Sequence, residues 1–149
     1  MSVKNLLFIE LGVIGAWIAG IFGGWDASMV TLIIFILIDY VTGLIVAGVF
    51  HKSPKTETGT LESKAGLKGL LRKGGMLLVV LIACRLDIML GYHFIRDAVV
   101  IAFVANEALS IIENLGLMGV PIPPPIINAI DVLKRKNQRD EKPTEENEK

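Results

Sequence analysis

Ionisable side chains lie inside every long apolar stretch of this chain of 149 residues. From the amino terminus onward these residues are Glu10, Asp39, Arg85 with Asp87, and Glu107 with Glu113. A charge at the centre of a bilayer costs a few kcal/mol on insertion scales unless it faces protein or water. Each of these groups therefore marks a partner or a function. The chemistry open to them is ion pairing, the lining of a water-filled passage, or proton relay.

Arg85 has no good partner on its own helix. It lies two residues from Asp87, and side chains with this spacing project from different sides of a helix. If the apolar stretches pack as antiparallel helices, Asp39 or Glu107 meets Arg85 at a comparable depth. A buried ion pair is then one explanation of these residues. The lining of a lesion or pore and a proton relay are the others.

The fourth apolar stretch carries a polar stripe. Asn106, Ser110, Glu113 and Asn114 stand at positions i, i+4, i+7 and i+8, and Glu107 lies at the margin of the stripe. Such a stripe most often mediates hydrogen bonds between helices, and it also suits a surface that lines water.

Catalytic, cofactor-binding and metal-binding motifs are not found in the sequence. His51 and His93 belong to no HExxH pattern, and the chain has neither a glycine-rich phosphate loop nor a recognisable nucleophile motif. Cys84 is the single cysteine, so it is interpreted as a small hydrophobic residue. We expect no enzyme activity, no cofactor and no nucleic-acid partner.

The elements that must position the polar residues are membrane spans. Hydrophobic residues make up 52% of the chain and the mean hydropathy is +0.59, which is unusual for a soluble domain of this size. We predict an all-α, polytopic membrane protein with spans at about 6–24, 29–50, 74–90 and 95–117. Residues 29–50 alone reach about 30 Å, the thickness of the hydrocarbon core. In a three-span alternative, the segment around Glu10 lies in the interface or enters the membrane late.

Small residues repeat along one face of the first predicted span. Gly12, Ala16, Gly20 and Gly24 follow one another at intervals of four residues, which permits close approach of another helix. The partner is either a helix of the same chain or another copy of the chain. The short connection at 25–28 predicts a hairpin of the first two spans.

The segment 51–73 contains six Lys or Arg residues and is the strongest cytoplasmic signal in the chain. Lys64, Lys68 and Arg72 recur every four residues and are followed by Lys73, which predicts a short basic helix on an anionic membrane surface. A solvated loop is the alternative. With four spans, 13 of the 15 Lys and Arg residues lie on one side, so both termini are expected in the cytoplasm.

Four prolines between 121 and 125 end the last span. Ile126, Ile127, Ile130 and Leu133 then form a brief apolar face, which predicts a short helix at about 126–133. We therefore expect a helical transmembrane domain at 1–133. Residues 134–149 contain no aliphatic or aromatic side chain and are expected to form a disordered, charged tail.

Three sequence motifs follow one another along the chain. They are Asp39-Tyr40-Val41-Thr42-Gly43, then Ser63-Lys64-x-Gly66-x-x-Gly69-Leu70-x-Arg72-Lys73, and finally Asn106-Glu107-x-x-Ser110-Ile111-x-Glu113-Asn114 followed by Gly119-x-Pro121-x-Pro123. Together they resemble the motifs of the toxin-secretion/phage-lysis holin family. The resemblance covers about residues 6 to 133, and three motifs in the right order and spacing are more specific than any one alone.

The resemblance implies a phage or prophage protein of the host's inner membrane that accumulates harmlessly and then forms lesions. Its partners would be the lipid bilayer and further copies of itself. It would work together with an endolysin or a toxin that leaves through the lesions, without direct contact being implied. The motif residues would serve structure or assembly, and the lesion-lining candidates are Asp39, Thr42, Gly43, Arg85, Asn106, Glu107, Ser110, Glu113 and Asn114.

Two other functions stay open at the level of sequence. A small ion channel or transporter would use Asp39 and Glu107 to coordinate ions or carry protons. A non-conducting scaffold, for example an inhibitor of a holin, would need neither.

Overall fold

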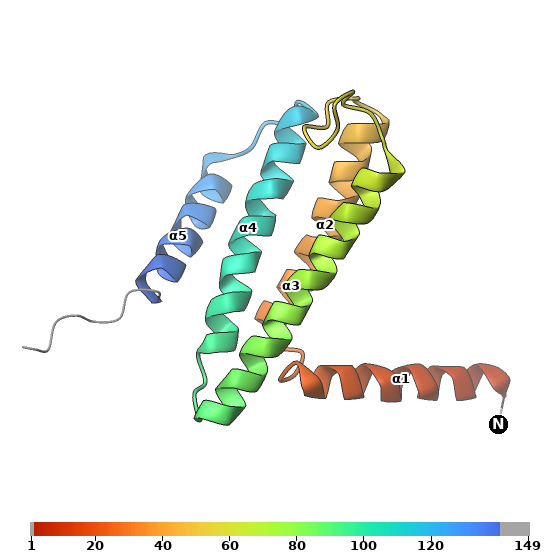
Figure 1. The fold of residues 1–149 in the computed structure, drawn as a ribbon, viewed down its shortest axis with the longest axis vertical. Helices are drawn as coiled ribbons and strands as arrows, with labels where there is room; N and C mark the ends of the chain where they lie inside the picture. Colours follow the sequence, from red (N-terminus) through yellow and green to blue (C-terminus); the bar gives the residue numbers. More distant parts are fainter. Residues whose placement is uncertain (1, 141–149) are drawn as a thin grey trace, which may run out of the picture.

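The computed structural model describes residues 2–140, which form five helices (Figure 1). They are α1 (Val3–Ile21), α2 (Ala27–Gly48), α3 (Ser63–Leu90), α4 (Ile95–Leu117) and α5 (Pro124–Asp140). No strand occurs within the described residues, so the predicted all-α fold is confirmed.

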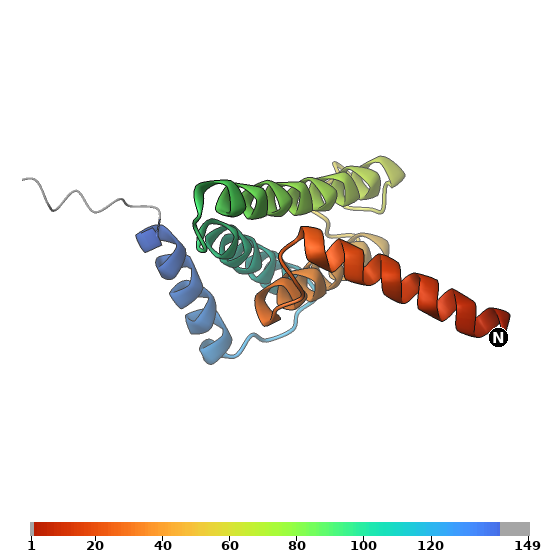
Figure 2. The ribbon, with the colours of Figure 1, turned by 90° about the horizontal axis from the view of Figure 1, so that it is seen from below.

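The centre of the molecule is a bundle of α2, α3 and α4 (Figures 1 and 2). Helix α4 is its central helix, since it contacts α2, α3 and α5. Its core takes residues spaced three or four apart, which share one face of a helix. These are Met29, Leu32 and Ile36 from α2, Val80 from α3, and Val100 and Val104 from α4.

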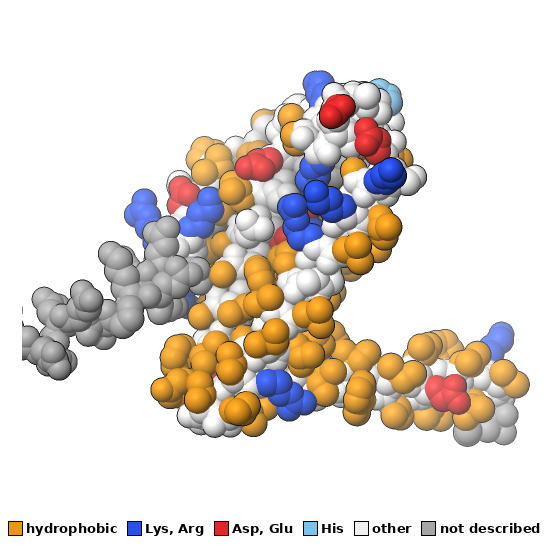
Figure 3. Space-filling model, in the orientation of Figure 1, with side chains coloured by type: hydrophobic (Ala, Val, Ile, Leu, Met, Phe, Trp, Pro, Cys, Tyr) orange, Lys and Arg blue, Asp and Glu red, His pale blue; other side chains and the backbone are white. Residues whose placement is uncertain are grey.

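Among the described residues, three helices are long and apolar enough to cross a membrane by length and composition, namely α1, α2 and α4. Hydrophobic side chains cover the lower part of the bundle and α1 in Figure 3, whereas charged side chains gather toward the upper end. The chain is a membrane protein. The three-span alternative excluded the first predicted span from the membrane. In the structure, the helix that is not apolar enough is instead α3, which carries Lys73, Arg85 and Asp87 along its length.

The third predicted span is part of a longer helix than expected. It was predicted to begin at 74, after a separate basic helix, whereas α3 runs without interruption from Ser63 to Leu90. Lys64, Lys68 and Arg72 therefore belong to the first half of a bundle helix. No proline separates the two parts, and the glycines of the basic segment are compensated by packing against α2, described below.

The predicted hairpin of the first two spans does not form as a packed pair. Helix α1 points away from the bundle, crosswise to α2 (Figures 1 and 2), and none of its residues is buried. Gly12 and Gly20 have open space where a Cβ atom would lie. Gly24 is not on the predicted ridge at all, because α1 ends at Ile21 and Gly24 has a φ of 100° in the following turn.

The carboxyl-terminal helix is also longer than predicted. Helix α5 extends from Pro124 to Asp140 and lies along α4, with Ile130 buried and Leu133 packed against the core. Residues 134–140, which were predicted to begin a disordered tail, continue the helix, because Lys, Arg and Gln are good helix formers and no Gly or Pro interrupts them. The rest of the predicted tail, 141–149, lies outside the described residues.

Candidate functional site

Three charged side chains meet in the interior of the bundle, one from each of its helices. The ammonium group of Lys73 on α3 donates to Asp39 Oδ2 on α2 at 2.6 Å, and also to Glu107 Oε2 on α4. The residues are buried, with exposures of 2% for Asp39, 9% for Lys73 and 1% for Glu107. We call these three residues the charge cluster. It joins two carboxylates to one ammonium group and ties α2, α3 and α4 together.

Lys73 occupies this place because it lies in register with the core face of α3. Counting back from the buried Val80 and Met76 by four and then three residues leads to Lys73. The prediction that Lys73 lies on the membrane surface with Lys64, Lys68 and Arg72 was wrong. Those three residues recur every four positions, whereas Lys73 falls outside this repeat and in register with the core face. Arg85, the predicted partner of the carboxylates, is exposed and pairs with neither.

Asn114 adds a second layer of polar contacts to the cluster. Its Nδ2 donates to Asp39 Oδ1 at 3.1 Å and to Thr42 Oγ1 at 3.0 Å. Thr42 in turn donates to the carbonyl of Ile38 at 2.8 Å. A Cβ atom at Gly43 would lie 3.8 Å from Asn114 Nδ2, so this glycine borders the same network. The structure thus brings together candidates from the first and third motifs.

The glycines of the second motif lie where α3 approaches α2. A Cβ atom on Gly66 would stand 3.8 Å from the hydroxyl of Tyr40, and one on Gly69 would stand 4.0 Å from its ring. Tyr40 follows Asp39 in the first motif. The second motif therefore supplies a narrow helix face as well as Lys73 of the charge cluster.

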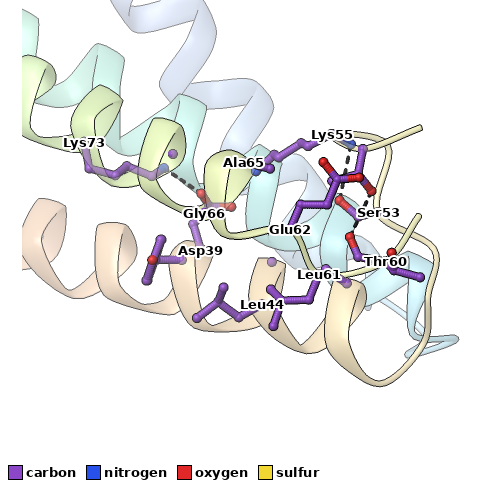
Figure 4. A pocket seen from close by; sticks show the side chains of 15 residues that line it. Asp39, Leu44, Ser53, Lys55, Thr60, Leu61, Glu62, Ala65, Gly66 and Lys73 are labelled. Atoms are coloured by element: carbon purple, nitrogen blue, oxygen red, sulfur yellow. Dashed lines mark hydrogen bonds and ion pairs between the residues drawn. The ribbon is translucent and has the colours of Figure 1, made fainter. Parts of the chain in front are cut away.

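Two cavities adjoin the charge cluster. A small one of about 60 Å³ lies between α2, the loop after it and the start of α3, and Figure 4 shows Lys73 extending from α3 toward Asp39 there. A larger one of about 560 Å³ lies beside α3 and α4. Asp39, Lys55 and Lys73 line both cavities.

The polar stripe of α4 divides between the interior and the larger cavity. Glu107 lies seven residues before Asn114, and both are buried on the face that carries Val100 and Val104. Glu107 is thus a core residue and not at the margin of the stripe. Asn106 and Glu113 are exposed, Ser110 is half-buried, and these three line the larger cavity together with Glu107.

A second polar cluster lies at the opposite end of the bundle. Asp87, buried at the end of α3, accepts hydrogen bonds from the backbone N–H groups of Ile95 at 3.0 Å and Arg96 at 2.9 Å. Unpaired N–H groups at the start of a helix are satisfied by such contacts. The partner that Asp87 needed is therefore the first turn of α4.

Arg96, a residue that the sequence did not single out, clamps the turn between α1 and α2. It donates through Nε to the carbonyl of Phe22 at 2.8 Å and through Nη1 to Asp26 Oδ2 at 2.6 Å. A Cβ atom on Gly23, where φ is 80°, would lie 3.2 Å from Cys84 Sγ, so the turn needs a glycine both for conformation and for space. The available signal was an arginine in the first turn of the fourth predicted span, next to a connection without Lys or Arg.

The contact with Arg96 changes the pKa of Asp26. The hydrogen bond from Arg96 lowers the pKa of Asp26 from 3.8 to about 2, against the opposing effect of burial. Hydrogen bonds from the backbone N–H of Met29 and from Ser28 act in the same direction. Asp26 also caps the first turn of α2, so one carboxylate links the start of α2 to the start of α4.

Comparison with known proteins points to one family. A sequence model of the bacteriophage holin family matches residues 16–135. An uncharacterised protein of Clostridium perfringens is 39% identical over 89% of this chain and 95% of its own length. An uncharacterised protein of Listeria monocytogenes is 36% identical, with 91% and 93% covered. A protein of Bacillus phage phi105 named a probable holin is 34% identical over 72% of this chain and 75% of its own length. No solved structure matches.

Proposed function

Since this chain belongs to the bacteriophage holin family, we propose that it is a holin of a bacterial inner membrane, in which it oligomerises and forms lesions. Through these lesions a cell-wall hydrolase, or a toxin, leaves the cytoplasm. The family is a membrane-pore class and not an enzymatic one, in line with the absence of catalytic motifs from the sequence.

The observation that carries the proposal is the charge cluster. In a single chain Asp39 and Glu107 are buried against Lys73, so the bundle can reside in lipid without exposing these charges. Polar groups of this kind become favourable on the surface once many copies surround water. The cluster is thus suited to a protein with a dormant form and a hydrated, assembled form.

Helix α1 supplies a surface for assembly in this proposal. It is apolar, none of its residues is buried, and it presents Gly12, Ala16 and Gly20 on one face. Small residues let helices approach closely in a membrane. We assign this face to contact between copies of the chain, because Gly12 and Gly20 have open space around them within the described residues.

The orientation that we propose places both termini and the basic loop after α2 in the cytoplasm. It requires α1 to cross the membrane in the assembled form, whereas in the single chain α1 lies crosswise to α2. The trigger that we propose is loss of the membrane potential, since moving one charge across the field is worth about 2.3 kcal/mol per 100 mV. Such an energy is large enough to shift the balance between two packings of a bundle.

Co-expression with a cytoplasmic wall hydrolase tests the function. Cells that express both proteins should lyse abruptly, and dinitrophenol should bring lysis forward. Selective ion leakage without release of the hydrolase would instead identify a channel or transporter. Normal growth at high membrane levels of the protein, with no response to dinitrophenol, would identify a scaffold and contradict the proposal.

A further inference from the structure

Basic side chains that do not belong to the charge cluster line the larger cavity. Its lining includes the cations Lys55, Lys68 and Arg72, which form no ion pair within 4.0 Å among the described residues. All three side chains are exposed. Lys73, a fourth cation of the lining, is held by Asp39 and Glu107. Outside the charge cluster, these three cations thus share the lining with one further carboxylate, that of Glu113.

The position of these cations matches that of lipid headgroups. Lys55 comes from the loop after α2, and Lys68 and Arg72 come from the first half of α3. Figure 3 shows basic side chains gathered near this end of the bundle, above a surface rich in hydrophobic side chains. Basic pockets between membrane helices on the cytoplasmic side are known to bind anionic headgroups.

The shape and the remaining lining favour a phospholipid over a small ion. The volume of about 560 Å³ falls in the range of small-molecule sites, and a lone phosphate would fill little of it. Met76 and Leu109 provide apolar wall beside the cations. An anionic phospholipid has both parts, a phosphate for the cations and acyl chains for the apolar wall.

We propose that this cavity binds the phosphate of an anionic phospholipid headgroup, with Lys55, Lys68 and Arg72 as its ligands. The site requires a chain that resides in a membrane, but it does not require lesion formation. It also distinguishes residues that the sequence grouped together, because Lys64 is absent from the cavity lining and Lys68 and Arg72 belong to it.

Lipid binding to the purified full-length protein in mild detergent tests the site. Native mass spectrometry would compare short-chain phosphatidylglycerol, phosphatidylcholine and inorganic phosphate. We expect preferential binding of phosphatidylglycerol and a loss of about 30-fold in affinity in a Lys68→Gln, Arg72→Gln double variant, from the removal of two cations near the headgroup. Lys55→Gln, on a different element, should weaken binding by about fivefold.

Lys64→Gln is the matched control, because it removes an exposed cation from the same helix outside the cavity. It should leave the affinity for phosphatidylglycerol unchanged. Equal losses in the control and the double variant would overturn the proposal in favour of nonspecific surface attraction. Binding of inorganic phosphate in preference to the lipid, or equal binding of both lipids, would overturn it as well. Circular dichroism without lipid checks that each variant is folded.

Discussion

At the scale of single residues, the main feature is that one ammonium group serves two buried carboxylates. Removing one partner from a buried ion pair leaves an uncompensated charge and costs about 3–5 kcal/mol. Lys73 is the sole cation in direct contact with Asp39 and Glu107 among the described residues. The stability of the bundle should therefore depend on Lys73 more than on any exposed lysine.

Lys73→Met should destabilise the protein by about 3–5 kcal/mol, because two neighbouring carboxylates lose their counter-ion. Thermal unfolding of the purified protein in detergent measures this loss. Lys64→Met, at an exposed position of the same helix, serves as the control and should cost less than about 0.5 kcal/mol. Combining Lys73→Met with Asp39→Asn and Glu107→Gln should restore most of the stability. A triple variant as unstable as the single one would contradict the role of charge pairing.

The same residues should set the time of lysis. Glu107→Gln leaves one carboxylate for one ammonium group, as does Asp39→Asn, so the closed bundle holds less unbalanced charge and should open later. Optical density of induced cultures that co-express a wall hydrolase records the onset. Glu57→Gln, in the exposed loop, is the control. Unchanged timing in both cluster variants would remove these residues from the mechanism.

At the scale of elements, Gly66 and Gly69 leave room on α3 for the side chain of Tyr40 on α2. Gly69→Ala should be neutral or should stabilise α3 by up to about 1 kcal/mol, because a methyl group meets the ring of Tyr40 at an ordinary contact distance and improves helix propensity. Gly69→Leu should destabilise the bundle, since its larger side chain has to displace Tyr40. Thermal unfolding distinguishes them, and equal midpoints would show that the helices do not approach closely here.

The turn between α1 and α2 should be sensitive to acid through Asp26. Because folding lowers the pKa of Asp26 from 3.8 to about 2, its contribution is present above pH 4 and is lost as the pH falls through 2. The side chain of Asp26 is 48% exposed, so this contribution is no more than about 1 kcal/mol. The stability difference between the wild type and Asp26→Asn should shrink between pH 4 and pH 2 in thermal unfolding. A difference that stays constant would contradict the ion pair with Arg96.

At the scale of the whole molecule, α1 and the bundle behave as separate parts. None of the residues of α1 is buried, whereas α2, α3 and α4 share a core and the charge cluster. Deleting residues 3–21 should therefore leave the thermal midpoint of the bundle within a few degrees of the full-length value and abolish lysis, because the assembly face is lost. Crosslinking in membranes should show fewer oligomers. Normal lysis by the shortened chain would exclude α1 from assembly.

Much of the architecture follows from local pattern. The bounds of α2 and α4 agree closely with the predicted spans, because long apolar runs ended by turn residues determine helices with little help from their neighbours. The earlier start of α3 and the later end of α5 were harder to predict from the sequence. Both extensions are polar segments, whose helical state depends on propensity and on packing against a neighbour.

The sequence by itself determined that this is a helical membrane protein of the holin family and that Asp39 and Glu107 need partners. Only the tertiary structure decided that the partner is Lys73 and not Arg85, that Asp87 caps α4, and that α1 leaves the bundle. The physical reason is that hydrophobic periodicity is local, whereas ion pairing depends on the rotation and depth of helices far apart in the chain. Neighbouring residues of a helix point in directions about 100° apart. For this reason Arg72 is exposed at the larger cavity, whereas Lys73 is buried in the core.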